Sequence, residues 1–216
     1  MLSSNAASQG TARVRKRPDE RRAEILDAAA RLALAEGLER ITLRAVADRL
    51  GVRPGLISHY YPAAEGLVAA AFALAISGER EILFAPDGRP LERIARIVDR
   101  VESGASEELA RLWLNARHLS RFSPVLGASI EEQEALDRDL LTALIEAGVE
   151  RGDFSTRDPE AACIRILMCI DGFGAYVNAA APFDHPAYAA FVSESVAREL
   201  GLPHEHLLDA IARLPR

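Results

Sequence analysis

Apolar residues recur at spacings of three and four along nearly the whole chain, which is the period of amphipathic helices. Ile25, Ala29 and Leu32 give the first such stripe, and convincing strand-like alternation of apolar and polar residues is absent. We therefore predict an all-α fold of about nine helices, near residues 18–36, 43–50, 54–61, 65–84, 91–103, 106–121, 124–151, 159–180 and 186–200.

The second and third predicted helices have well-marked ends. Thr42 can cap the second helix, which Gly51 ends. Pro54 is a natural first residue for the third helix, and Pro62 prevents it from continuing. Only the residues "GVR" separate the two helices, which favours a sharp crossing over an antiparallel hairpin. This geometry is typical of a helix-turn-helix unit.

In such a unit the second helix enters the major groove of DNA. Helical spacing places Val52, Ile57 and Tyr61 inward. The remaining residues of this helix, together with Arg44 of the preceding one, become candidates for DNA contact: Arg44, Arg53, Pro54, Gly55, Leu56, Ser58, His59 and Tyr60.

The side chains of these candidates suit different parts of the duplex. Gly55 permits close approach of the backbone, Ser58 can bond a base, and Leu56 can touch a thymine methyl group. His59 and Tyr60 can bond phosphates. The alternatives are that His59 and Tyr60 cap a small helical core and that Arg44 is only solvated.

Charge is distributed unevenly along the 216 residues. Residues 1–61 contain eleven Lys or Arg and seven Asp or Glu, whereas the remaining 155 residues contain fifteen and twenty-five. A basic head on an acidic body is expected when one end of a protein meets phosphate. Within the head, residues 1–17 form a basic arm whose charges either follow DNA or only aid solubility: Arg13, Arg15, Lys16 and Arg17.

Composition predicts a soluble protein. Apolar residues make up 49% of the chain, and no apolar run approaches the roughly 18 residues needed to cross a bilayer. Cys163 and Cys169 lie six residues apart in an apolar helix, which suits neither a metal site nor a redox pair. We expect free buried thiols in a reducing cytoplasm and no interaction with a membrane.

The predicted helix at residues 159–180 is apolar nearly all round, so another helix or another subunit must cover it. Large or polar side chains among its apolar neighbours and in the preceding helices are candidates for lining a ligand cavity, although most would also fit an ordinary core: Trp113, Asn115, His118, Phe122, Met168, Asp171, Phe173, Tyr176 and Asn178. An unpaired Asp171 would favour a cationic ligand. Pairing with Arg117 or Arg165 is the alternative that we favour.

Enzyme signatures are absent from the sequence. There is no nucleophile elbow, phosphate-binding loop, dinucleotide fingerprint or metal-spaced cluster. A catalytic or metal-binding pair of His118 and Asp171 has no support from spacing. We expect no enzymatic activity, no metal and no cofactor.

The stretch "RRAEILDAAARLALAEGLERITLRAVADRLGVRPGLISHYYPAAEGLVAAAF", residues 21–72, resembles the DNA-binding domain of the TetR family of bacterial transcriptional regulators. The residues that match the family pattern are Gly37, Thr42, Val46, Ala47, Gly51, Val52, Gly55, Ile57, Tyr60, Tyr61 and Leu67. Within the family, "GLISHYY" is similar to the choline-responsive betaine-synthesis repressors.

The resemblance implies a DNA-binding domain at residues 18–66 and a helical effector-binding and dimerisation domain at residues 67–216. It implies a homodimer that binds a palindromic double-stranded operator, represses transcription and is released by a small-molecule effector. Positions matching Arg44, Pro54, Gly55 and Ser58 face bases in some members, while those matching Thr42, Leu56, His59 and Tyr60 lie along the backbone.

Two residues depart from the family pattern. Arg53 stands where a serine or threonine cap is common, and Ala64 stands where a lysine often holds a phosphate. The missing lysine leaves open a protein that keeps the fold for protein interaction and lacks operator specificity.

Overall fold

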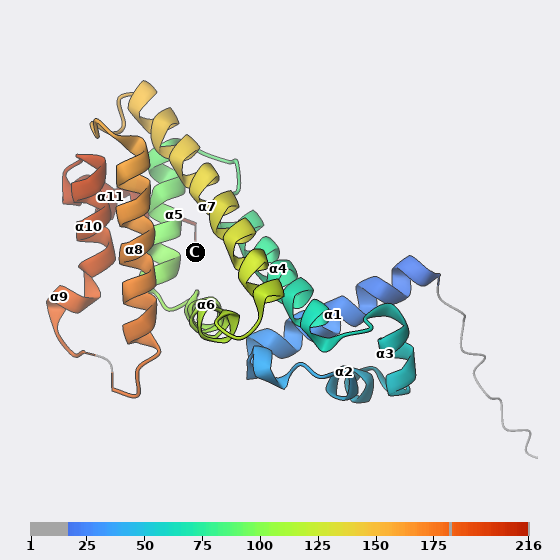
Figure 1. Cartoon of the computed structure of the whole chain (residues 1–216). Coiled ribbons are helices and arrows are strands. Elements are labelled where there is room, and N and C mark those ends of the chain that lie inside the picture. The colour runs from blue at the N-terminus through green and yellow to red at the C-terminus, as the bar shows by residue number, and fades with distance from the viewer. Residues whose placement is uncertain (1–16, 182, 216) are drawn as a thin grey trace, which may run out of the picture.

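The computed structural model describes residues 17–181 and 183–215, and these form eleven α-helices and one short 3₁₀ helix (Figure 1). The described residues include no strand, so the all-α prediction is confirmed. In chain order the elements are α1 (Pro18–Glu36), η1 (Leu38–Arg40), α2 (Leu43–Leu50), α3 (Pro54–Tyr60), α4 (Ala64–Leu83), α5 (Pro90–Glu102), α6 (Glu107–Ser120), α7 (Pro124–Glu150), α8 (Pro159–Val177), α9 (Pro186–Ala189), α10 (Phe191–Leu200) and α11 (His204–Ala212).

Local sequence explains where the first helices begin and end. The hydroxyl of Thr42 accepts a hydrogen bond from the backbone N–H of Ala45 at 3.0 Å, which caps α2. Gly51 ends α2 in the left-handed conformation at φ 62°. Pro54 occupies the first turn of α3, where its missing N–H is not needed. These boundaries agree with the sequence-based prediction.

The C-terminal helices differ from the prediction in three ways. The expected helix at residues 186–200 is divided into α9 and α10, because Ala190 adopts non-helical dihedral angles of φ −101° and ψ 8°. Helix α8 ends at Val177, where Asn178 donates a side-chain hydrogen bond to the carbonyl of Gly174 at 2.9 Å. Helix α11 was not predicted; Leu207 lies on its buried face, against the core of the body.

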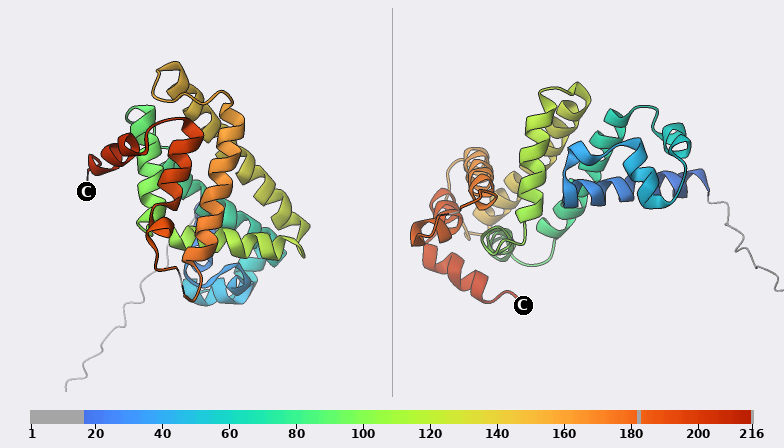
Figure 2. Two further views of the ribbon diagram at one scale, coloured as in Figure 1. Left: turned by 90° about the vertical axis from the view of Figure 1, so that its left-hand side faces the viewer. Right: turned by 90° about the horizontal axis from the view of Figure 1, so that it is seen from below.

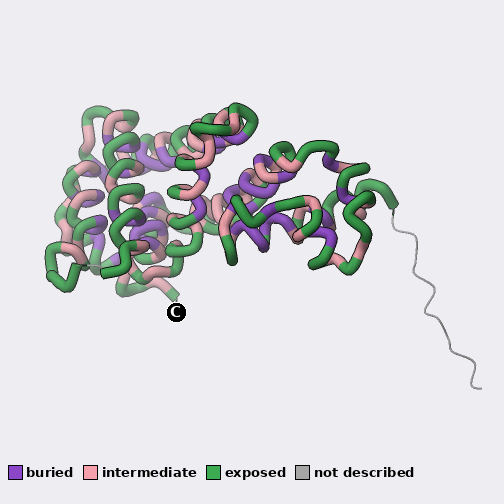
Figure 3. The backbone as a smooth tube through the Cα atoms, turned by 60° about the horizontal axis from the view of Figure 1, so that its bottom comes forward, coloured by how far each residue is buried: buried purple, intermediate pink, exposed green. Residues whose placement is uncertain are grey.

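Two hydrophobic cores organise the molecule, and α4 connects them (Figures 1 and 3). The core of the head joins α1, α2 and α3 to α4 from Leu67 to Ile76 and to parts of α6 and α7. The core of the body joins α5, α8, α10 and α11 to the second half of α7. Because α4 starts in the head and ends against the body, it crosses the predicted domain boundary at residue 66.

Candidate functional site

Helix α3 presents a polar face to solvent at the end of the head. Ile57 is fully buried and Tyr61 is 5% exposed, so these two residues fasten α3 to the head core, as predicted. Val52 is half-buried and packs on the same core. The opposite face of α3 is therefore free to meet a partner.

The residues predicted to contact DNA lie on or beside this face. Most are exposed, while Leu56 and Tyr60 are half-buried; the exposed residues are Thr42, Arg44, Arg53, Pro54, Gly55, Ser58 and His59. The guanidinium of Arg44 lies 3.9 Å from Asp48 one turn along α2, and 85% of the Arg44 side chain is exposed. A pair this exposed contributes little to stability, so Arg44 can exchange it for another partner at small cost.

Three side chains of α3 have local partners that limit their motion. The hydroxyl of Ser58 donates to the carbonyl of Gly55 at 3.2 Å, which leaves its oxygen free to accept. The rings of His59 and Tyr60 meet edge to face with centroids 5.2 Å apart. Tyr60 also packs on the head core, so its predicted role as a core cap and its predicted role at phosphate are compatible.

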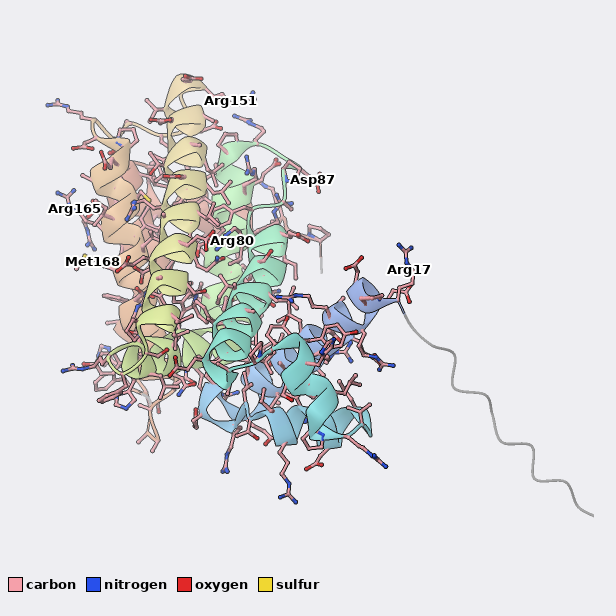
Figure 4. All side chains as sticks on the ribbon, turned by 45° about the vertical axis from the view of Figure 1, so that its right-hand side comes forward. Arg17, Arg80, Asp87, Arg151, Arg165 and Met168 are labelled. Carbon is pink, nitrogen blue, oxygen red and sulfur yellow. The ribbon has the colours of Figure 1, made fainter. Side chains whose placement is uncertain are left out.

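Basic charge also lies beside this face. Arg17 is exposed at the start of α1 (Figure 4), and the guanidinium of Arg22 lies over the ring of Tyr61 at 4.8 Å from its centroid. The other charges of the predicted arm, those of Arg13, Arg15 and Lys16, lie outside the described residues.

A cavity of about 300 Å³ lies in the body and is walled by α4, α5, α6, α7 and α8. This volume is at the lower end of the range for small-molecule sites, roughly 300–1,000 Å³. Four of the predicted residues line it, namely Trp113, Met168, Asp171 and Phe173. Met168 is 69% exposed while it lines the cavity, so the cavity is open to solvent beside α8.

The other predicted residues lie outside this cavity, which corrects their expected placement. Asn115 follows Trp113 by two residues and therefore points to the far side of α6, toward the head. His118 and Phe122 are exposed, and their rings meet edge to face with centroids 5.9 Å apart. Tyr176 is 52% exposed and lies against Phe183. Asn178 is bound to the carbonyls of Gly174 and Glu107.

Apart from Asp171, the charged residues of the cavity wall were not among the candidates predicted from the sequence. The wall contains five carboxylates and three guanidinium groups, at Glu79, Glu107, Glu134, Asp137, Asp171, Arg80, Arg117 and Arg138. Their spacing on α7 is the signal that was available, because Glu134, Asp137, Arg138 and Leu141 recur at three and four on one helix face.

Arg117 is at the centre of the charged part of the wall. It donates to Asp171 at 2.8 Å and to Glu134 at 3.1 Å, and its guanidinium lies 5.0 Å from the centroid of the Trp113 ring. Burial alone would lower the pKa of Arg117, but the two carboxylates outweigh burial and raise it. Burial raises the pKa of Asp171, an effect that Arg117 opposes and Glu134 reinforces. The prediction that an arginine pairs with Asp171 is confirmed.

A second arginine joins α4 to α7 at the same cavity (Figure 4). Arg80 donates to Asp137 at 2.5 Å and to the side chain of Gln133 at 2.9 Å. Burial raises the pKa of Asp137; Arg80 lowers it, and Asp171 and Glu134 raise it further. The cavity therefore holds an excess of carboxylates, two of which have raised pKa values.

Helix α6 connects the cavity to the head through two contacts. The Trp113 ring meets the fully buried ring of Phe72 edge to face at 5.0 Å, and Phe72 belongs to the head core. The Asn115 side chain accepts from the backbone N–H of Leu38 at 2.8 Å and donates to Glu39 at 2.9 Å. Leu38 and Glu39 form η1, which leads from α1 to α2.

Metal binding, disulfide formation and membrane insertion receive no support in the part of the chain that the structure describes. It contains no group of three His, Cys, Asp or Glu side chains placed to hold a metal ion. Cys163 and Cys169 are free thiols, the first buried and the second half-buried. Among these residues no helix on its own has the length and apolar content to span a bilayer; α3 and α4 meet these criteria only jointly, across a 75° bend.

Comparison with known families matches both parts of the chain. The model of bacterial regulatory proteins of the tetR family matches residues 25–71, and the model of the C-terminal region of BetI-type transcriptional repressors matches residues 90–201. A search of curated proteins finds no match.

Solved structures share the fold at low sequence identity. A TetR transcription regulator from Haloarcula marismortui is 19% identical, with a TM-score of 0.69 over 85% of this chain and 97% of that one. A transcriptional regulator from Saccharomonospora viridis, solved in complex with choline, is 19% identical, with a TM-score of 0.66 over 90% and 97%. The fatty acid degradation regulator FadR from Bacillus halodurans is 22% identical, with a TM-score of 0.63 over 87% and 97%.

Proposed function

The chain belongs to the TetR family of bacterial regulatory proteins, and from this premise we propose that it is a ligand-responsive repressor. In this proposal a homodimer binds a palindromic operator with one α3 helix in each of two successive major grooves. A small molecule in the body cavity then weakens that binding.

The observation that carries the proposal is the course of α4. Its first half supplies Leu67 and Phe72 to the head core, and its second half supplies Glu79 and Arg80 to the cavity wall. A rearrangement of the cavity that moves the second half of α4 must therefore act on the elements that hold α3.

The faces of α8 and α10 support a dimer. These helices lie side by side at the end of the body away from the head (Figures 1 and 2). Several large apolar side chains on and beside them remain exposed in the single chain, namely Ile164, Met168, Tyr176, Phe183 and Phe191. A second copy that covers them would bury apolar surface and set the distance between the two heads.

The cavity wall supports an effector that is a small organic cation. Carboxylates outnumber guanidinium groups there, and the indole of Trp113 offers a ring face of the kind that attracts cations. The structurally similar regulator from Saccharomonospora viridis was solved with choline, a compound of this class. In the present chain Arg117 already occupies the Trp113 face, so an incoming cation must displace it from Trp113, Asp171 or Glu134.

Displacement of Arg117 offers a route from ligand to DNA. Arg117 and Trp113 both belong to α6, which contacts the head through Phe72 and through η1. A shift of α6 would disturb these contacts and change the placement of α3.

A gel-shift titration with the DNA upstream of the protein's own gene tests the proposal. We expect a discrete complex that survives an excess of unrelated DNA and weakens when choline is added. Binding that unrelated DNA removes equally well would contradict operator recognition and favour a protein that keeps the fold for another interaction.

A further inference from the structure

A second cavity, of about 360 Å³, lies between the start of α5 and the end of α11. On α5 it is lined by Leu91, Glu92 and Arg96, whereas the effector cavity is lined by Ile97 and Val101. At 100° per residue these two sets face opposite sides of the helix. Figure 2 shows α11 beside α5 in the left view. The second cavity is therefore separate from the effector site.

Basic residues predominate in the lining of this cavity, whereas carboxylates predominate in the lining of the first. Three arginines line the second cavity, Arg89, Arg96 and Arg213, with Glu92 as the opposing charge. Glu92 accepts from the backbone N–H of Arg89 at 2.9 Å and so caps α5. The guanidinium of Arg89 is paired with Asp153 at 2.5 Å. Positive charge is left at Arg96 and Arg213.

Arg96 and its neighbour Arg93 are bound to neutral groups. The guanidinium of Arg96 donates to the carbonyls of Ala85 and Asp87, in the loop that precedes α5, and that of Arg93 donates to the carbonyl of Phe84 at 3.4 Å. Carbonyl oxygens satisfy hydrogen bonds but do not neutralise charge. Within residues 17–181 and 183–215 neither arginine forms an ion pair, and the Nε atom of each is buried without a hydrogen-bond partner.

The surroundings of Arg93 reflect this unbalanced charge. Burial lowers the pKa of Arg93 and the nearby charge of Arg96 lowers it further, while Asp87 opposes the shift only in part. Asp87 lies in the loop ahead of α5 (Figure 4). An anion placed beside Arg96 would therefore relieve a repulsion that the described carboxylates leave in place.

Arg213 completes the arrangement from the other wall. Its 3.6 Å pair with Asp209, one turn earlier in α11, is largely exposed, with 78% and 67% of the two side chains accessible. Such a pair is weak, so Arg213 can turn to a ligand at small cost. Arg96 from α5 and Arg213 after α11 thus offer guanidinium groups on two sides of one cavity.

We propose that the cavity between α5 and α11 binds a small metabolite through a carboxylate or phosphate group held by Arg96 and Arg213. Guanidinium groups match both anions, because their parallel N–H donors bond two oxygens at once. This site is independent of the proposed operator and of the proposed cationic effector.

Isothermal titration calorimetry on the full-length, DNA-free protein tests the site. Inorganic phosphate and succinate are titrated separately at constant ionic strength. Wild-type protein should bind at least one of them, and Arg96→Gln and Arg213→Gln should each raise the Kd about tenfold, the effect of losing a charge-assisted hydrogen bond. Within the described residues Arg213 forms no hydrogen bond or ion pair with the loop before α5, so Arg213→Gln keeps the test valid if Arg96→Gln fails to fold.

Arg121→Gln is the matched control, because Arg121 is an exposed arginine at the end of α6 that lines neither cavity. It should leave the Kd unchanged. Binding of phosphate alone assigns a phosphate-bearing ligand, and binding of succinate alone assigns a carboxylate. The proposal is overturned if neither anion gives a heat of binding, if the Kd is unaltered in Arg213→Gln, or if binding is lost in Arg121→Gln, which would place the anion outside this cavity.

Discussion

Arg117 sets the chemistry of the body cavity. It neutralises Asp171, contacts Glu134 and covers one face of Trp113. A buried carboxylate without such a partner would be costly. From the sequence we expected Arg117 or Arg165 to pair with Asp171, because an unpaired buried carboxylate is costly. The choice of Arg117 and the contribution of Glu134, which follows Arg117 by seventeen residues, depended on how α6 packs against α8 and α7.

The reading face of α3 allows base contacts to be separated from backbone contacts. We expect Ser58→Ala to change sequence preference by on the order of 1 kcal/mol at one base position, because the proposed complex brings the exposed hydroxyl to a base. Tyr60→Phe should weaken binding to all sites by a similar factor, because a phosphate contact carries no sequence information.

Selection from a randomised DNA pool with each variant measures both effects. The preferred sequence should change in Ser58→Ala and stay the same in Tyr60→Phe. A uniform loss of affinity in both variants would show that the assignment of Ser58 to bases and Tyr60 to phosphate is wrong.

Asp137 links the stability of the fold to pH. Its pKa is raised in the folded state, first by burial, so folding favours the protonated form. The associated stabilisation is present below the ordinary carboxyl pKa and is lost as the pH rises through the raised folded value. We therefore expect the free energy of unfolding of wild type, relative to Asp137→Asn, to fall as the pH is raised from about 4 to 7.

Urea denaturation of the two proteins at a series of pH values provides the measurement. Asp19→Asn, at an exposed position in the first turn of α1, serves as the control substitution. If the free energy of unfolding of wild type instead rises relative to that of Asp137→Asn as the pH increases, the sign derived from burial is wrong.

At the scale of elements, the helices of the head were predictable because their ends depend on local chemistry. A capping Thr42, a left-handed Gly51 and a Pro54 act within one or two turns. The break at Ala190 has no such local signal, since alanine favours helix, and it depends on how α9 and α10 pack. Helix α11 was missed because its nine residues follow Gly201 and Pro203, which indicate a stop.

The phase of α6 decides which cavity residues were predictable. Trp113 and Arg117 lie one turn apart and line the cavity, while Asn115 lies between them in sequence and faces the head. Composition alone marked Trp113 and Asn115 as equally good candidates. Only the position of α6 between head and body separates the side of this helix that lines the cavity from the side that contacts η1.

Asn115 is expected to support the coupling between cavity and head. Asn115→Ala removes both side-chain hydrogen bonds to η1 and leaves the N–H of Leu38 without this partner. We expect the free energy of unfolding to fall by about 1–3 kcal/mol and the effect of ligand on operator affinity to shrink. Urea denaturation and DNA titrations with and without ligand measure the two effects.

His118→Ala is the control on the same helix, because His118 is exposed and contacts Phe122 rather than the head. The ligand effect on operator affinity should be retained in this variant. If Asn115→Ala and His118→Ala respond equally to ligand, the contact between α6 and η1 does not transmit the signal.

At the scale of the whole molecule, the exposed apolar face of α8 and α10 predicts the assembly. Tyr176→Glu combined with Phe191→Glu places two charges on this face. We expect the dissociation constant of the dimer to rise about thirtyfold or more, as for the loss of an interface hot spot. Sedimentation equilibrium of wild type and variant measures it.

Phe122→Glu is the matched control for surface apolarity. Phe122 is 74% exposed but lies at the turn between α6 and α7, outside the face of α8 and α10. Its substitution should leave the dimer intact. An unchanged dimer in the Tyr176 and Phe191 double variant would exclude this face as the interface.

In the proposed mechanism the cavity and the operator site influence each other through α4 and α6. This coupling is tested most directly by titrating choline, or the organic cation that most raises the melting temperature in a screen, into the free dimer and into the dimer saturated with operator. Thermodynamic linkage requires the operator complex to bind the ligand more weakly, by the same factor by which the ligand lowers operator affinity. Equal ligand affinity for the free and operator-bound dimer would contradict the account.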